Sequence, residues 1–173
     1  EYNRAGMDQV AQGYMVGFEG SLPTVRHLLC SYRFPKTYQP NFPVDAFATY
    51  QEGWAPQVYF IGDSRQDGGA IQLERSKIQY DGIQSLPFYP VAPTYVAAGP
   101  WTATGTQLRL FFEKAIALGC EGVSVWDLPQ ANADQLLAIK NFVWPGPVPP
   151  PPDPVPVEIR APAGSIDLTF MEI

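Results

Sequence analysis

The segment GVSVWDL at residues 122–128 decides the fold class of this chain. It is short, largely apolar, and rich in β-branched and aromatic residues, which is typical of a buried strand. A helical pattern precedes it, with Thr104 or Thr106 as the candidate N-cap and Gly119 at the C-terminal cap position. Asn132 is placed to cap a second helix after the strand. This alternation of helix and strand predicts β-α units around a parallel sheet.

Three further apolar segments predict strands of the same sheet. They cover residues 28–32, 57–61 and 87–92. Apolar residues at helical spacing predict helices at 7–18, 43–50 and 70–80. The strand centres recur roughly every 30 residues, which is the length of a β-α unit.

Residues 1–144 are too few for a closed barrel. A (β/α)8 barrel takes about 250 residues, so four β-α units make about half of one. The alternative is an open doubly wound sheet, which usually has a glycine-rich phosphate loop after its first strand. Neither SYRFP at 31–35 nor GDSR at 62–65 has that form. We therefore expect an α/β domain forming half of a (β/α)8 barrel, whose sheet is completed by the rest of its chain or by another copy.

Proline separates this domain from the C-terminus. Nine of the 18 residues from Pro145 to Pro162 are proline, which predicts an extended linker over 145–162. Residues 163–173 continue an alternating pattern that begins at Val157, and they form either a strand pair or the start of a further module. The first residues carry neither an initiator Met nor a leader pattern, so we expect the chain to begin inside a longer polypeptide or after processing.

Composition narrows the range of partners. The chain has 173 residues and a net charge of -6, without a run of Lys or Arg, which argues against nucleic acid and against an anionic membrane surface. Neutral or cationic partners fit better. No apolar run reaches the ~20 residues of a membrane span.

The few His and Cys residues predict no metal site. The chain has one His and two Cys without the spacing of zinc ligands, so we expect no metal and no other cofactor. Cys30 and Cys120 lie in apolar stretches, and we expect both to be buried free thiols.

Three strings together resemble a known family of barrels. They are APQVYF at 55–60, LPFYPVA at 86–92 and GVSVWD at 122–127. In this order and spacing they resemble the sixth, seventh and eighth strands of chitinase-like and lysozyme-like glycoside hydrolase barrels, with 26–33 as the fifth. The resemblance implies the C-terminal half of such a barrel, acting on or binding a polysaccharide such as peptidoglycan or chitin. It also implies that Gln57, Tyr59 and Trp126 line the sugar site.

The resemblance is incomplete at the catalytic strand. In those barrels the proton-donating acid ends the fourth strand, which this chain contains only if Glu1 is its last residue. The Asp-x-x-Asp-x-Asp-x-Glu motif of chitinases is absent. Two functions therefore stay open, a glycosidase completed by residues outside this chain, and a non-catalytic module on a proline-rich stalk that binds glycan or protein. A glycan partner would place the protein at a cell wall or outside the cell.

Two aspartates occupy equivalent positions in the predicted sheet. Asp63 and Asp127 each follow a predicted strand at the same relative height in their β-α units. Glycoside hydrolysis uses two carboxyl groups about 5 to 9.5 Å apart. Asp127, Asp63 and Glu1 are therefore the candidate catalytic groups. Turn formation or helix capping is the alternative role for the two aspartates.

Polar and aromatic side chains near the strand ends are the candidates for substrate binding. They are Arg33, Gln57, Tyr59, Tyr95 and Trp126. Side chains alternate along a strand, so Gln57 shares a face with Tyr59, and Ser124 shares one with Trp126. An indole on the open side of the sheet would offer a stacking platform for a sugar ring. The alternative is a core-filling indole enclosed by helix residues such as Phe111.

Overall fold

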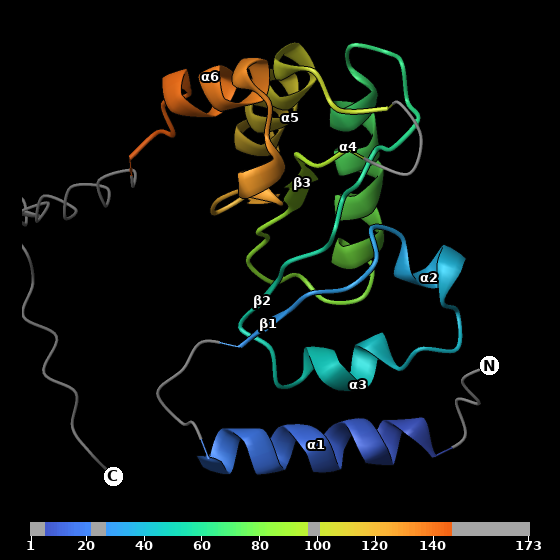
Figure 1. The fold of residues 1–173 in the computed structure, drawn as a ribbon. Coiled ribbons are helices and arrows are strands. Elements are labelled where there is room, and N and C mark those ends of the chain that lie inside the picture. Colours follow the sequence, from blue (N-terminus) through green and yellow to red (C-terminus); the bar gives the residue numbers. More distant parts are fainter. Residues whose placement is uncertain (1–5, 22–26, 97–100, 147–173) are drawn as a thin grey trace, which may run out of the picture.

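The computed structural model describes residues 6–21, 27–96 and 101–146 (Figure 1). Glu1, the linker from residue 147 onward and the segment 163–173 lie outside the described residues. The helices are α1 (Met7–Ser21), α2 (Pro35–Tyr38), α3 (Val44–Ala48), α4 (Gly68–Asp81), α5 (Gly105–Ala117) and α6 (Ala133–Asn141), with a short 3-10 helix at Leu128–Gln130. The strands are β1 (Leu28–Leu29), β2 (Gly53–Trp54), β3 (Val91–Pro93) and β4 (Ser124–Trp126).

The four strand segments pair in parallel, as the sequence predicts, and they do so in chain order. β1 pairs with β2, and β3 pairs with β4. Isolated parallel bridges extend these pairs, joining Tyr32 to Gln57, Gln57 to Val91, and Trp54 to Phe88. The described residues thus form an α/β arrangement of short parallel strand pairs. The strands have only two or three residues each and are shorter than expected. The second strand lies before the predicted segment 57–61, in which only Gln57 forms bridges.

Three long helices cover one face of these strands. α4 packs on α5, and α5 packs on α6, so consecutive crossovers lie side by side (Figure 1). In the two middle segments, residues 54–60 and 88–92, the even-numbered side chains lie on the side of these helices and are buried, among them Trp54, Val58 and Phe88. They meet helix residues such as Leu73 and Phe111 in one core. The hydrophobic alternation therefore selects the face that the helices cover.

The opposite face of the strands is uncovered in the described structure, and we call it the open face. It carries the exposed residues Cys30, Tyr32, Gln57, Ser124 and Trp126. The register places these residues in rows across the sheet, because Tyr32 lies opposite Gln57, Gln57 opposite Val91, and Val91 opposite Ser124. One face of these strands is thus apolar and buried under the helices, and the other is exposed and carries polar and aromatic side chains.

The predicted helix caps are confirmed, whereas the predicted burial of one cysteine is wrong. Thr104 and Asn132 each form a capping box at the start of α5 and α6, and Gly119 has the positive φ of 68° that the end of α5 requires. Cys120 is buried, as expected. The expectation that Cys30 is buried is wrong. Strand alternation places Cys30 on the open face, on the same side as Tyr32, where no helix covers it.

Candidate functional site

A groove of about 390 Å³ lies on the open face, where the chain leaves β1 and passes beside residues 57–61. We call it the aromatic groove. It is lined by Tyr32, Arg33, Tyr38, Gln39, Gln57, Tyr59 and Ile61. Three of the five predicted substrate-binding residues, Arg33, Gln57 and Tyr59, therefore meet in one concavity. Its volume lies within the range of small-molecule sites.

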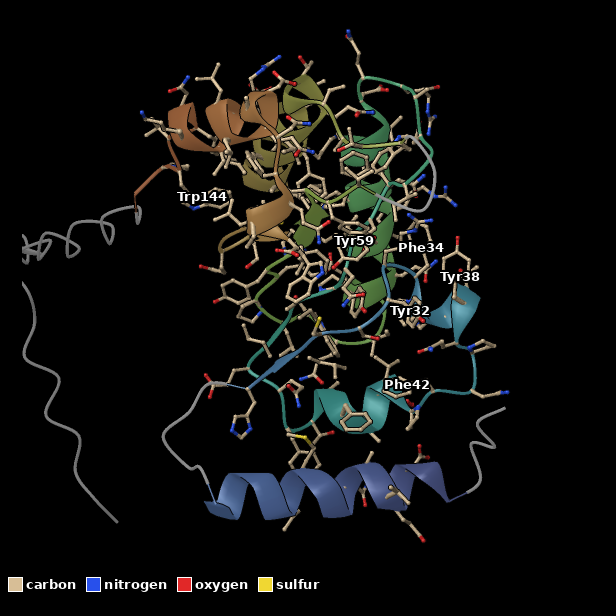
Figure 2. The ribbon with its side chains drawn as sticks, in the orientation of Figure 1. Tyr32, Phe34, Tyr38, Phe42, Tyr59 and Trp144 are labelled. Atoms are coloured by element: carbon tan, nitrogen blue, oxygen red, sulfur yellow. The ribbon has the colours of Figure 1, made fainter. Side chains whose placement is uncertain are left out.

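Backbone pairing and a short helix build the groove. The amide of Gln57 donates to the carbonyl of Ser31 at 2.8 Å, and this bond sets Tyr32 beside Gln57. The buried hydroxyl of Tyr80 donates to the carbonyl of Tyr32 at 2.6 Å, which ties the strand end to α4. α2 then starts with proline at its first turn and brings Tyr38 to the same side as Tyr32 (Figure 2).

Tyr59 and Tyr95 form an aromatic pair next to the groove. Their ring centroids lie 5.6 Å apart in an edge-to-face arrangement, which fixes both rings. Burial, helped by the neighbouring Tyr95, raises the pKa of Tyr59 to about 12. Burial also raises the pKa of Tyr95. Both phenols are therefore neutral at physiological pH and can donate and accept hydrogen bonds.

The Gln57 side chain offers its amide to the groove. Its Nε2 atom lies 3.6 Å from the sulfur of Cys30, which is a weak acceptor. The side chain is exposed and lines the groove. A ligand with hydroxyl groups can both donate to and accept from such an amide.

Trp126 lies on the open face at the end of β4. It is 61% exposed, so the alternative of a core-filling indole is wrong. Pro93 pairs with Trp126, and Gln57, two residues before Tyr59, forms a parallel bridge with Val91, two residues before Pro93. If this register continued to Tyr59, two strand spacings of about 4.8 Å would separate the Tyr59 and Trp126 backbones. An extended ligand could contact both rings.

Asp63 has a well-defined structural role. Its carboxylate accepts two hydrogen bonds from the Arg65 guanidinium, at 2.9 and 2.6 Å, and one from the Arg65 backbone amide. The hydrogen bonds from Arg65 lower the pKa of Asp63 to about 2. The carboxylate also lies against Gly68 at the start of α4, where a negative charge is favourable. An acid that stays ionised near neutral pH is unsuited to proton donation.

Asp127 follows Trp126 directly and is half-buried. Its carboxylate accepts a hydrogen bond of 2.8 Å from Nε2 of Gln130, and the Trp126–Asp127 peptide bond is cis. No hydrogen bond or ion pair joins Asp127 to Asp63 among the described residues. The third candidate, Glu1, lies outside them. The catalytic assignment of these carboxylates stays a prediction.

Four residues of the groove were missed by reading the sequence, namely Tyr32, Tyr38, Gln39 and Ile61. Tyr32 could have been found, because it alternates with Cys30 on a strand that was expected to neighbour residues 57–61. Tyr38 and Gln39 come from α2, a four-residue helix with no periodic pattern to mark it. Another hollow of about 490 Å³ lies between α5 and α6, but its Arg109 is already paired with Glu113.

Within the described residues, no helix is long and apolar enough to cross a membrane, and no group of three His, Cys, Asp or Glu is placed to hold a metal ion. Comparison with known proteins adds no identification. The chain matches no protein-family model, no curated protein and no solved structure.

Proposed function

We propose that this chain is a glycan-binding module, with the aromatic groove and Trp126 as its binding surface. The observation that carries the proposal is a concavity lined by Tyr32, Tyr38, Tyr59 and Gln57 on an otherwise uncovered sheet face. Aromatic faces bind the apolar faces of sugar rings, and a neighbouring amide and neutral phenols satisfy the ring hydroxyls. A polysaccharide such as peptidoglycan or chitin is the proposed class of ligand.

The finer fold proposal is that the domain forms half of a (β/α)8 barrel. Two features support it. The strand segments neighbour one another in chain order, and α4, α5 and α6 cover the same face. A doubly wound sheet instead reverses its strand order and places helices on both faces. In this proposal the open face is the lumen side, and the remaining strands come from the rest of the polypeptide or from another copy.

A second candidate function is glycoside hydrolysis. It is favoured by Asp127, whose carboxylate directly follows the exposed Trp126 at the end of β4. The lowered pKa of Asp63 suits a base or nucleophile and not the proton donor. The acid would then have to come from Glu1 or from a strand outside this chain. Turnover of chitin or peptidoglycan that is lost in Asp127→Asn would favour this candidate.

Binding to soluble chito- and muro-oligosaccharides tests the proposed function. Titration of the whole chain by calorimetry should give saturable binding, weakened at least tenfold in Tyr59→Ala. Ile78→Ala is the matched control, because Ile78 is exposed on α4 and absent from the groove lining. No binding to any oligosaccharide, or equal binding by Tyr59→Ala and wild type, would refute the proposal.

A further inference from the structure

The aromatic groove presents tyrosine rings and hydrogen-bond donors. Tyr32 and Tyr38 are exposed, and Tyr59 completes the set of three tyrosines in the lining. Within the described residues, the one tyrosine hydroxyl that forms a hydrogen bond is that of Tyr80. The hydroxyls of the three groove tyrosines are therefore available to donate to a ligand. A ligand that fits this lining has apolar faces and hydrogen-bond acceptors.

The sequence of the chain contains a segment with these properties. Residues 147–156 read PVPPPPDPVP and belong to the run in which nine of 18 residues are proline. This composition predicts a polyproline II helix, which offers apolar rings and backbone carbonyls but few N–H donors. Aromatic-lined grooves bind such helices, because the helix is already extended and loses little entropy on binding.

The charges of the groove and the segment are also complementary. Arg33 is the one charged residue of the groove lining, and it forms no ion pair within the described part of the chain. Its guanidinium carbon lies 5.8 Å from the ring centroid of Tyr38, so it faces the same aromatic surface. Asp153 is the one charged residue of 147–156. A guanidinium binds a carboxylate through charge-assisted hydrogen bonds.

The segment starts on the far side of the molecule from its own groove. The groove lies where the chain leaves β1, and Figure 2 shows Trp144 and Tyr38 on opposite sides. Three strand spacings of about 4.8 Å separate Tyr32 from Ser124 across the sheet. Crossing those roughly 14 Å alone takes about five polyproline residues at about 3.1 Å each, which is half of the segment. A segment from another molecule has no such limit.

We infer that the aromatic groove binds the proline-rich segment 147–156 of a second copy of this chain. Proline rings lie against Tyr32 and Tyr38, the tyrosine hydroxyls donate to the backbone carbonyls, and Asp153 pairs with Arg33. Two copies that exchange their segments form a closed dimer. The inference goes beyond glycan binding, and a sugar and the segment exclude each other from the groove.

Self-association of the whole chain tests the inference. Sedimentation velocity over a range of concentrations should show the mass rising from 19.1 kDa toward twice that value. Tyr38→Ala changes the groove, and Pro150→Gly with Pro151→Gly loosens the polyproline helix. Each variant should weaken association at least tenfold. Ile78→Ala, on an exposed site of α4, and Pro162→Gly, outside the segment, are the matched controls and should leave association unchanged.

Mixing two defective variants shows that the contact joins different molecules. Tyr38→Ala retains an intact segment, and the double glycine variant retains an intact groove. A mixture of the two should therefore associate, although neither does so alone at the same concentration. A charge exchange tests the predicted ion pair. Arg33→Glu and Asp153→Arg should each weaken association, and the variant that carries both should recover most of it. Circular dichroism melting curves check that every variant is folded.

The outcomes separate this inference from the glycan proposal. A wild-type chain that stays monomeric at every concentration overturns the inference. Association that survives both Tyr38→Ala and the double glycine change, or that does not return on mixing the two variants, also overturns it. The double glycine variant keeps its groove, so its binding of chito- or muro-oligosaccharides tests the glycan proposal independently of self-association.

Discussion

The two faces of the sheet differ completely, although the same strands supply both. Toward the helices, Trp54, Val58 and Phe88 are fully buried, while on the other side Gln57 and Trp126 are exposed. Burial of the first set stabilises the fold through apolar area removed from water. The second set contributes little of that kind. Side chains that alternate along one strand are therefore divided into those that stabilise the fold and those that are free to bind a ligand.

Thiol labelling should give the largest contrast between the faces. Cys30 is exposed on the open face, whereas Cys120 is buried and its pKa is raised by burial to about 12. A buried thiol reacts only when the structure opens. We expect Cys30 to react with a maleimide at least about 1000-fold faster than Cys120 in the native protein, measured by mass spectrometry over time. Cys30→Ser should abolish the fast phase, and similar rates for both thiols would contradict the comparison.

Truncation of one large aromatic residue on each face compares their contributions to stability. Phe111 is completely buried beside Phe60, so Phe111→Ala should lower the free energy of unfolding by about 3 to 5 kcal/mol. Trp126→Ala should lower it by less than about 1 kcal/mol, because the indole already faces water. Urea denaturation measures both values. Comparable losses would show that the open face is part of the core.

Replacing one glycine on each face by alanine compares how tightly the two faces pack. A Cβ atom on Gly69 would lie 2.7 Å from the ring of Phe60, which is held between Trp101 and Phe111. Gly69→Ala should therefore destabilise the protein by about 1 to 3 kcal/mol, although alanine favours a helix.

The matched change on the open side is Gly122→Ala. Its Cβ atom would meet Tyr89 at 3.5 Å, an ordinary contact, so the free energy of unfolding should change by less than about 0.5 kcal/mol. Thermal or urea unfolding compares the two variants. A tolerated Gly69→Ala would mean that the covered face packs more loosely than described.

Local signals in the sequence predicted the fold better than they predicted the site. The caps at Thr104 and Asn132 and the parallel pairing of the strand segments follow from residues close in sequence, and they are confirmed. The second strand is Gly53–Trp54 and not 57–61, so its predicted position is wrong. The burial of Cys30 was wrong because the strand around it is apolar on both sides, so composition alone does not show which side meets the helices. That choice is made by tertiary packing.

The groove required tertiary information as well. Arg33, Gln57 and Tyr59 were named from the sequence, but their meeting point depends on the register between Tyr32 and Gln57. Arg65 forms an ion pair with Asp63, only two residues away in the sequence. No sequence pattern predicts that these two side chains turn toward each other.

Of the predicted effects on stability, the one at alkaline pH should be the smallest. Burial raises the pKa of Tyr59 from 10.0 to about 12, so the folded protein holds this proton more tightly than the unfolded chain does. The resulting stability is complete below pH 10 and is lost as the pH rises toward 12. Tyr59→Phe should flatten part of the decline in melting temperature over this window. Tyr38→Phe, an exposed phenol on α2, is the control and should leave the decline unchanged.

The central claim is that the open face binds sugar while the covered face holds the fold together. It is tested most directly by amide chemical shifts of the isotope-labelled chain during titration with a soluble oligosaccharide that binds. The account predicts saturable shifts confined to residues 32–39, 57–61, 93–95 and 124–127, with α5 and α6 unchanged. Shifts concentrated between α5 and α6, or spread evenly over the chain, would contradict it.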